Sequence, residues 1–89
     1  MIEPERLPPP PFWRTRYFAF TVMGKADRRW IDPIDIARAL AQPIRKERQP
    51  DGRVRQWAYI PRLATYIRIV TLADGETVHN VFKDGGFVE

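Results

Sequence analysis

Two Asp-Gly dipeptides constrain the fold of this chain more than any other feature of its sequence. Asp51-Gly52 and Asp74-Gly75 each lie between runs of residues that favour β-strands. Because Asp and Gly both tolerate the positive φ angles of tight hairpin turns, such a dipeptide predicts a β-hairpin. The second half of the chain is therefore expected to form two hairpins, with strands at residues 44–49, 53–60, 65–72 and 76–82.

The turn sequence of the first hairpin predicts its register. Gln49-Pro50-Asp51-Gly52 suits a type I turn with a glycine bulge, because Pro stands at the first central position and Gly at the last. In this register Glu47 lies opposite Arg55, which is a favourable cross-strand pair of opposite charges.

The register of the second hairpin decides which face of the sheet carries the single histidine. A two-residue turn at Asp74-Gly75 pairs Val70 with His79. Arg68 and His79 are then diagonal neighbours on one face, roughly 7–8 Å apart at the backbone. A three-residue turn with a glycine bulge would shift the register by one residue and move His79 to the opposite face. We take the two-residue turn as our expectation.

The middle of the chain carries the start and stop signals of one α-helix. Asp32 is a candidate N-cap, Pro33 falls at the first helical position, and Asp35 places negative charge in the first turn. Pro43 ends the helix, which is expected over residues 33–42, with an apolar stripe that covers a small sheet.

The N-terminal part divides into a tail and a first strand. Residues 1–11 contain five prolines and are expected to be a flexible, Pro-rich lead-in. The stretch 16–22 is rich in aromatic and β-branched residues and is expected to be a strand. The prediction is thus a single α+β domain over residues 12–89, with the order β-α-β-β-β-β. Its one helix packs on a four- to five-stranded antiparallel meander.

Composition excludes most familiar enzyme classes. The chain has no Cys and no Ser, which excludes disulfides, thiol nucleophiles, thiolate metal sites and a Ser-His-Asp triad. One His makes no conventional zinc site, and no Gly-rich phosphate loop precedes the helix. We therefore expect no cofactor and no metal. The chain shows neither a long apolar run nor a signal-peptide pattern, so we expect a cytoplasmic protein without membrane contact.

The net charge of +4 comes mostly from arginine, which supplies twelve of the fifteen basic residues. Arginine binds phosphates through its planar fork of donors and stacks on bases, so this composition fits RNA or DNA binding. An acidic protein partner fits the same charge. So does a solvated surface on which these arginines pair with the eleven acidic residues.

The predicted sheet supplies the candidate site residues. Arg68 and His79 are the candidate catalytic residues, because an arginine can hold a phosphate and a histidine exchanges protons near neutral pH. A proton-transfer group and a phosphate-binding group are the minimum set of side chains for metal-free RNA cleavage. The alternatives are a histidine bonded to a backbone group and an arginine paired with an acid. The candidate residues for nucleic-acid contact alternate along the third predicted strand or share a face with Arg68: Arg53, Arg55, Trp57, Tyr59 and Tyr66. The aromatic residues among them also fit cross-strand packing in a core.

Three segments of the chain carry a family resemblance: FTVMGKADRRWIDPIDIARALAQP, QPDGRVRQW and YIRIVTLADGETVHNVFKDGGF. Over roughly residues 18–87 the chain resembles a family of small bacterial domains related in pattern to the RelE and ParE toxins. Those toxins belong to the barnase, EndoU, colicin and RelE-like grouping of small nuclease folds. The resemblance implies a RelE-like fold.

The resemblance also implies a function and partners. In that grouping a toxin cleaves RNA on the ribosome, or inhibits another essential target, and is neutralised by a small antitoxin encoded beside it. The functional residues that the resemblance implies are Arg68 and His79, with Arg55 and Lys83 as phosphate contacts. The implied partners are RNA and a small acidic antitoxin protein.

One departure from the family pattern bears on catalysis. Related domains carry a His just after the Phe-Thr of the first strand, where this chain has Val22 and Met23. A Tyr, Lys or Glu would have to replace that second acid or base. Two functions therefore follow: a metal-independent ribonuclease toxin, or a non-catalytic module of the same fold whose Arg-rich sheet face binds nucleic acid or an acidic protein. The sequence leaves the oligomeric state open.

Overall fold

The structure is a computed structural model that describes residues 6–7 and 12–89. The strands are β1 (Arg6–Leu7), β2 (Arg14–Thr15), β3 (Arg45–Arg48), β4 (Val54–Ile60), β5 (Thr65–Thr71) and β6 (Val78–Lys83). The helical elements are the π-helical segment η1 (Tyr17–Val22), the α-helix α1 (Pro33–Ala41), and the 3-10 turns η2 (Ala26–Arg28) and η3 (Pro61–Leu63). The predicted α+β class is confirmed. Apart from β1, the predicted lead-in lies outside the described residues.

The sheet is mixed, with the strand order β1-β2-β6-β5-β4-β3. The strands β3 to β6 are sequential antiparallel neighbours, as the two hairpins predicted. The expectation of an entirely antiparallel sheet is wrong, because β2 runs parallel to β6 with Arg14 opposite Val78. The Val78 N–H donates to the carbonyl of Trp13 over 2.8 Å, so the N-terminal segment adds to the free edge of β6.

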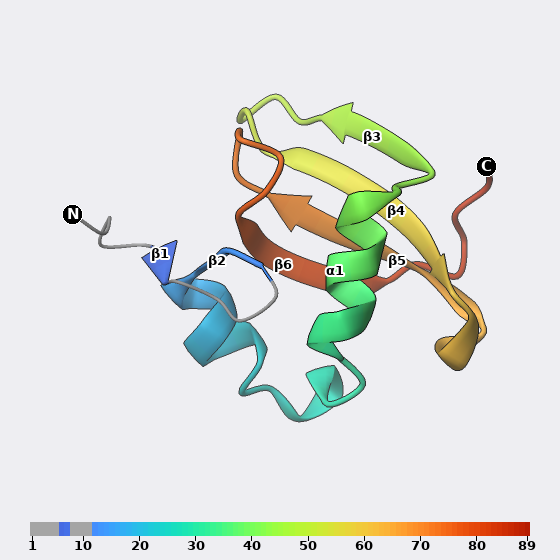
Figure 1. Cartoon of the computed structure of the whole chain (residues 1–89), viewed down its shortest axis with the longest axis horizontal. Coiled ribbons are helices and arrows are strands. Elements are labelled where there is room, and N and C mark those ends of the chain that lie inside the picture. The colour runs from blue at the N-terminus through green and yellow to red at the C-terminus, as the bar shows by residue number, and fades with distance from the viewer. Residues whose placement is uncertain (1–5, 8–11) are drawn as a thin grey trace.

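Helix α1 lies across one face of this sheet, in front of the antiparallel strands in Figure 1. The predicted N-cap is confirmed: the Asp32 carboxylate accepts a hydrogen bond of 2.9 Å from the Ile34 N–H, and Pro33 is the first helical residue. Ile36 and Ala39 are buried against the sheet. The opposite face of β4, β5 and β6 lies away from α1, and we call it the open face.

The core lies between α1, η1 and the covered face of the sheet. Strand residues alternate between the two faces, so Ala58, Ile67 and Ile69 point into the core while their neighbours point to the open face. The buried apolar cluster consists of Phe18, Val22, Ile31, Ile36, Ala39, Ala58, Ile60, Ile67, Ile69, Val78 and Val81. This cluster fixes which strand residues remain available for function on the other side.

The expected strand at residues 16–22 is wrong, because this segment is helical. Phe18 and Val22, four positions apart, are fully buried, whereas Phe20 between them is 72% exposed. A strand would have buried all three on one face, so the burial has a helical period. The Thr15 hydroxyl accepts a hydrogen bond of 3.1 Å from the Phe18 N–H, in the manner of a helix N-cap.

The first hairpin has the predicted turn and register. The Gly52 N–H donates to the Gln49 carbonyl over 2.9 Å, and Gly52 takes a positive φ of 90°. Glu47 lies opposite Arg55, as expected. The strand bounds, residues 45–48 and 54–60, are shorter than predicted by one or two residues.

The second hairpin differs from the expectation. Its β-turn spans Leu72–Gly75, with a hydrogen bond of 2.9 Å from the Gly75 N–H to the Leu72 carbonyl. The predicted two-residue turn at Asp74-Gly75 is therefore wrong. The Asp74 carboxylate instead holds the start of the next strand by accepting from the Thr77 N–H and hydroxyl at 2.9 and 2.6 Å.

A register shift in β6 changes the predicted pairing of His79. Thr71 lies opposite Val78, but Val70 lies opposite Asn80, so His79 is an extra residue in a β-bulge. The predicted pairing of Val70 with His79 is wrong. The consequence for the site is nevertheless small, because the bulge leaves His79 and Asn80 both on the open face, where they line one pocket.

Candidate functional site

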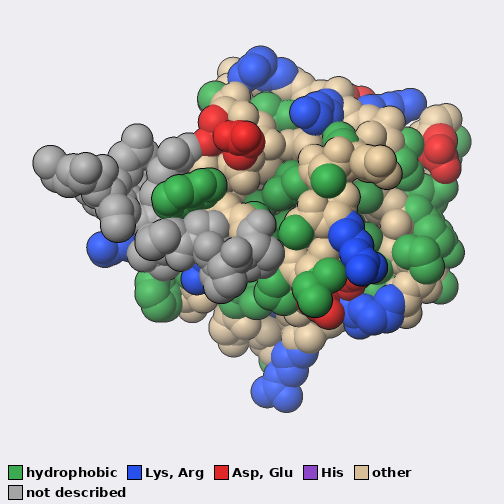
Figure 2. Space-filling model, viewed as in Figure 1, with side chains coloured by type: hydrophobic (Ala, Val, Ile, Leu, Met, Phe, Trp, Pro, Cys, Tyr) green, Lys and Arg blue, Asp and Glu red, His purple; other side chains and the backbone are tan. Residues whose placement is uncertain are grey.

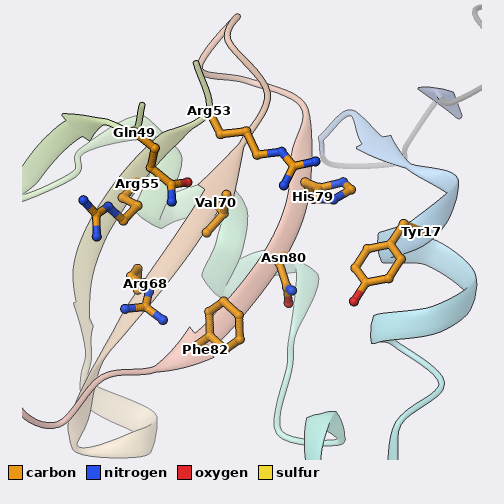
Figure 3. A pocket seen from close by; sticks show the side chains of 9 residues that line it. All are labelled: Tyr17, Gln49, Arg53, Arg55, Arg68, Val70, His79, Asn80 and Phe82. Atoms are coloured by element: carbon orange, nitrogen blue, oxygen red, sulfur yellow. The ribbon is translucent and has the colours of Figure 1, made fainter. Parts of the chain in front are cut away.

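The open face of the sheet contains a pocket of about 450 Å³ at the end nearest the β3–β4 turn. Figure 3 shows the side chains that surround it, which come from η1, the turn, β4, β5 and β6. The lining residues are Tyr17, Gln49, Arg53, Arg55, Arg68, Val70, His79, Asn80 and Phe82. Three arginines predicted as site residues, Arg53, Arg55 and Arg68, thus line the same pocket as the predicted catalytic residue His79.

Aromatic rings hold two of the arginines in place. The Arg68 guanidinium carbon lies 4.7 Å from the centre of the Phe82 ring, and Phe82 is the cross-strand partner of Arg68. The Arg55 guanidinium carbon lies 5.9 Å from the centre of the Trp57 ring. Such cation–π contacts restrict the side chains without using their N–H donors. The guanidinium groups are therefore preorganised and still able to bind an anion.

The acidic partners of these arginines are distant. The nitrogen–oxygen distances are 3.9 Å from Arg68 to Asp84 and 3.7 Å from Arg55 to Glu47. Both distances exceed the usual range of a hydrogen bond, so these carboxylates partly balance the charge but do not occupy the donors. Arg53 likewise lies 3.7 Å from Asp51.

Three polar atoms of this pocket are buried without a hydrogen-bond partner among the described residues. They are the Nε atoms of Arg55 and Arg68 and the amide oxygen Oε1 of Gln49. A buried donor or acceptor that stays unpaired destabilises a fold by about 1–3 kcal/mol, so such atoms usually have a partner. Because all three atoms are enclosed by protein, the groups open to a ligand are the exposed parts of the arginine side chains, 35% exposed for Arg55 and 33% for Arg68.

His79 is oriented at the other end of the pocket by two contacts from the N-terminal segment. Its Nδ1 lies 3.1 Å from the hydroxyl oxygen of the buried Thr15. The ring of Tyr17 stacks on the imidazole at a centroid distance of 4.9 Å and an angle of 27°. In Figure 3 the Arg53 side chain extends in the direction of the His79 ring. The helical segment η1 therefore contributes one wall of the site.

The predicted aromatic contacts lie elsewhere on the open face. Trp57 is only 6% exposed, because Phe87 stacks on it at 5.1 Å and its indole N–H donates to Asp84 over 2.9 Å. Tyr66 contacts Phe87 at 5.2 Å and Tyr59 at 5.2 Å. We call these four rings, Trp57, Tyr59, Tyr66 and Phe87, the aromatic cluster. None of the four rings lines the pocket, although Trp57 lies beside it, in contact with Arg55 and opposite Arg68.

Tyr66 and Lys83 also have partners away from the pocket. The Tyr66 hydroxyl donates to the Glu89 carboxylate over 2.7 Å, and this hydrogen bond is the main cause that raises the pKa of Tyr66 above its usual 10.0. Lys83 pairs with Ile67, so it lies on the covered side of the sheet, 5.5 Å from the centre of the Trp30 ring. The structure therefore separates Lys83 from the other predicted phosphate contacts.

Sequence reasoning missed several pocket residues. Tyr17 was missed because the segment around it was expected to be a strand. Gln49 was placed at the end of a predicted strand and in its turn but was not a candidate site residue, although its position two residues from Glu47 of the predicted Glu47–Arg55 pair was a usable signal. Figure 2, viewed from the helix side, shows Lys and Arg side chains on that face as well, so basic charge is not confined to the pocket.

Within residues 6–7 and 12–89, no group of three or more His, Cys, Asp and Glu side chains could hold a metal ion. No helix in the described part of the chain is long and apolar enough to cross a membrane. The chain matches no family model, and neither a curated protein nor a solved structure shows significant similarity to it.

Proposed function

We propose that this protein binds RNA, with phosphate groups of the strand in the arginine pocket on the open face of the sheet. One observation carries this proposal. The side chains of Arg53, Arg55 and Arg68 line one pocket and are 33–44% exposed, and each of them has an Nη atom that lies 3.7–3.9 Å from its acidic neighbour, beyond hydrogen-bond distance. A phosphate supplies several acceptors for the exposed guanidinium N–H groups and is the anion that suits the planar arginine fork.

The overall charge favours a polyanion over a single acidic side chain. A carboxylate of a protein partner could meet one recessed guanidinium. An RNA strand also gains from the net charge of +4, and its repeated charge can meet all three arginines of the pocket. We therefore place RNA first, and an acidic protein partner such as an antitoxin becomes the alternative outcome of the test.

The test is the salt dependence of binding to a labelled single-stranded RNA, followed by fluorescence anisotropy. Release of counterions by three arginine–phosphate contacts predicts a slope of about −2 in log K against log salt concentration. Arg55→Met and Arg68→Met should each weaken binding about tenfold to a hundredfold, since each removes a charge-assisted hydrogen bond. The matched control is Arg38→Met, because Arg38 is exposed on α1, outside the pocket. Absent or salt-independent binding would contradict the proposal and favour a protein partner.

A second candidate function is metal-independent cleavage of that RNA, the activity of a ribonuclease toxin. The observation that favours it is the position of His79, which lines the same pocket as Arg68 and is oriented by Thr15 and Tyr17. A group that transfers protons and a group that stabilises negative charge then face the same phosphate.

The cleavage step forms one bond and breaks another at phosphorus. The 2′-oxygen of a ribose attacks the adjacent phosphorus, and the bond from phosphorus to the 5′-oxygen of the next nucleotide breaks. A base takes the 2′-hydroxyl proton, and an acid gives a proton to the leaving 5′-oxygen. In this proposal His79 performs one transfer, Tyr17 is the candidate for the other, and Arg68 stabilises the charge on the phosphate oxygens.

Cleavage is tested with an end-labelled RNA in the presence of EDTA. We expect a 2′,3′-cyclic phosphate product from the wild-type protein and none from His79→Ala. The variant should keep its RNA affinity to within a few-fold if the arginines supply most of the binding. If the wild-type protein binds RNA and leaves it intact, the protein is a binding module. Growth during expression of the wild-type chain and of His79→Ala then tests for toxicity.

A further inference from the structure

The C-terminal segment, residues 84–89, lies on the open face of the sheet and covers part of the aromatic cluster. The ring of Phe87 stacks on Trp57 at a centroid distance of 5.1 Å and an angle of 17°. The same ring contacts Tyr66 edge-on at 5.2 Å, and the guanidinium carbon of Arg45 lies 5.2 Å from its centre. Trp57 is only 6% exposed. A flat ring of the protein itself thus occupies the indole of Trp57.

Trp57 lies beside the arginine pocket. Arg68 is its cross-strand partner, and the Arg55 guanidinium carbon lies 5.9 Å from the centre of its ring. Opposite side chains on one face of an antiparallel pair have Cβ atoms about 4.5–5.5 Å apart. A nucleotide whose phosphate is bound by Arg55 and Arg68 therefore has the reach to place its base on Trp57. Aromatic rings and arginine planes are the surfaces on which unpaired RNA bases stack, and Phe87 has one of each as neighbours.

Side chains provide most of the attachment of this segment to the sheet. The Asp84 N–H donates to the Tyr66 carbonyl over 2.8 Å. Within the described part of the chain, the one backbone hydrogen bond of residues 85–89 runs from the Phe87 N–H to the Asp84 carbonyl, at 3.2 Å, inside the turn of the segment itself. Gly85 and Gly86, which are exposed, precede Phe87 and restrict the backbone little. Phe87 can therefore leave Trp57 without breaking a backbone hydrogen bond to the sheet.

The chemistry of the segment resembles that of a nucleotide, because it combines a flat ring with anions. The Glu89 carboxylate accepts from the Tyr66 hydroxyl over 2.7 Å, and the Asp84 carboxylate lies 3.9 Å from Arg68. We infer that the C-terminal segment competes with RNA for the open face: Phe87 occupies the place of a base on Trp57, and bound RNA displaces it. This inference rests on the proposed RNA-binding function and adds to it a base-stacking subsite that the chain itself controls.

The competition has a measurable effect on affinity. A base reaches Trp57 only in the fraction of molecules from which Phe87 has moved away, and the apparent affinity falls with that fraction. Phe87→Ala removes the competing ring. It should therefore bind RNA about tenfold more tightly than the wild-type protein, the effect of one base stacked on an aromatic side chain.

The experiment compares two labelled probes of equal length by fluorescence anisotropy. One is a single-stranded oligoadenosine, and the other is the same ribose–phosphate chain without bases. Phe87→Ala should gain about tenfold in affinity for the oligoadenosine and nothing for the abasic chain, because the two probes carry the same phosphates. The matched control is Val88→Ala, at the next position, where the side chain is 79% exposed. It should leave both affinities unchanged.

A second variant and a second readout separate this effect from a loss of structure. Phe87→Leu keeps an apolar side chain over Trp57 and removes the flat ring, so it should show a smaller gain in the same direction. Urea unfolding establishes that each variant is folded. In protein labelled with fluorotryptophan, the oligoadenosine should move the fluorine NMR signal of Trp57 farther than the abasic chain does. The signal of Trp30, on the covered side of the sheet, should stay in place.

The outcomes distinguish this inference from the function on which it rests. An equal gain for the two probes would overturn the base-stacking subsite, since the segment would then act through its charge alone. Unchanged or weaker binding of the oligoadenosine by Phe87→Ala would overturn the competition. Both results leave RNA binding by the wild-type protein in place. Failure of the wild-type protein and of Phe87→Ala to bind either probe would overturn the proposed function itself.

Discussion

Thr15→Val tests the connection between the N-terminal segment and the site. The Thr15 hydroxyl is buried, accepts from the Phe18 N–H at 3.1 Å and lies 3.1 Å from His79 Nδ1. Val has nearly the same shape and no hydroxyl. Leaving the buried Phe18 N–H unpaired should cost about 1–3 kcal/mol, and the lost contact with His79 about 0.5–1.5 kcal/mol. We therefore expect a total loss of about 2–4 kcal/mol.

Urea unfolding followed by tryptophan fluorescence measures this loss, provided that the slope with denaturant matches that of the wild-type protein. For a domain of this size, 1 kcal/mol corresponds to about 4–8 °C in melting temperature, so Thr15→Val should melt at least about 8 °C lower. Thr15→Ser is the matched control, because it keeps the hydroxyl and removes one methyl group, worth about 0.8 kcal/mol. If the Thr15→Val variant is as stable as the Thr15→Ser variant, the hydroxyl does not stabilise the helical segment as described.

Three further predictions concern the open face and the second hairpin. Trp57→Phe should lower the free energy of unfolding by about 1–3 kcal/mol, because it removes the indole donor to Asp84, and Trp57→Tyr should not restore it. Hydrogen bonding to Glu89 raises the pKa of Tyr66, so the stabilisation from this contact should be complete below pH 10 and lost as pH rises above it; an absorbance titration against Tyr66→Phe measures this. Gly75→Ala should destabilise the fold by about 1 kcal/mol, because Gly75 has a positive φ of 72°; Gly86→Ala is the control, and equal melting of the two would contradict the argument.

The helix and the first hairpin could be predicted because local chemistry determines them. Asp32 caps the helix with its own side chain, and Gly52 supplies the positive φ of its turn, so neither depends on distant parts of the chain. The segment 16–22 could not be predicted in the same way. Its aromatic and β-branched residues favour a strand, and only packing of Phe18 and Val22 into the core makes it helical. Tertiary contacts here override local propensity.

Only part of the site could be predicted, because local pattern places some of its residues and long-range contacts place others. Arg55 and Arg68 occupy strand positions whose side chains point to the open face. Their placement follows from the alternation of side chains along a strand and does not depend on the loops. His79 lies on the same face as Arg68, as predicted, but its place in a bulge is encoded by no short motif and follows a turn that differs from the expected one. Trp57 was misplaced because the C-terminal segment returns to the sheet and covers it with Phe87, a long-range contact without a local signal.

The central claim is that an RNA phosphate pairs with the guanidinium groups of Arg55 and Arg68 in the pocket. The most direct measurement is an NMR titration of the arginine Nε–Hε signals, assigned by single substitutions, with a short RNA oligonucleotide. The account predicts that the signals of Arg55 and Arg68 move downfield in proportion to the bound fraction, while that of the exposed Arg38 stays in place. Signals of Arg55 and Arg68 that remain unchanged at saturating RNA would contradict it.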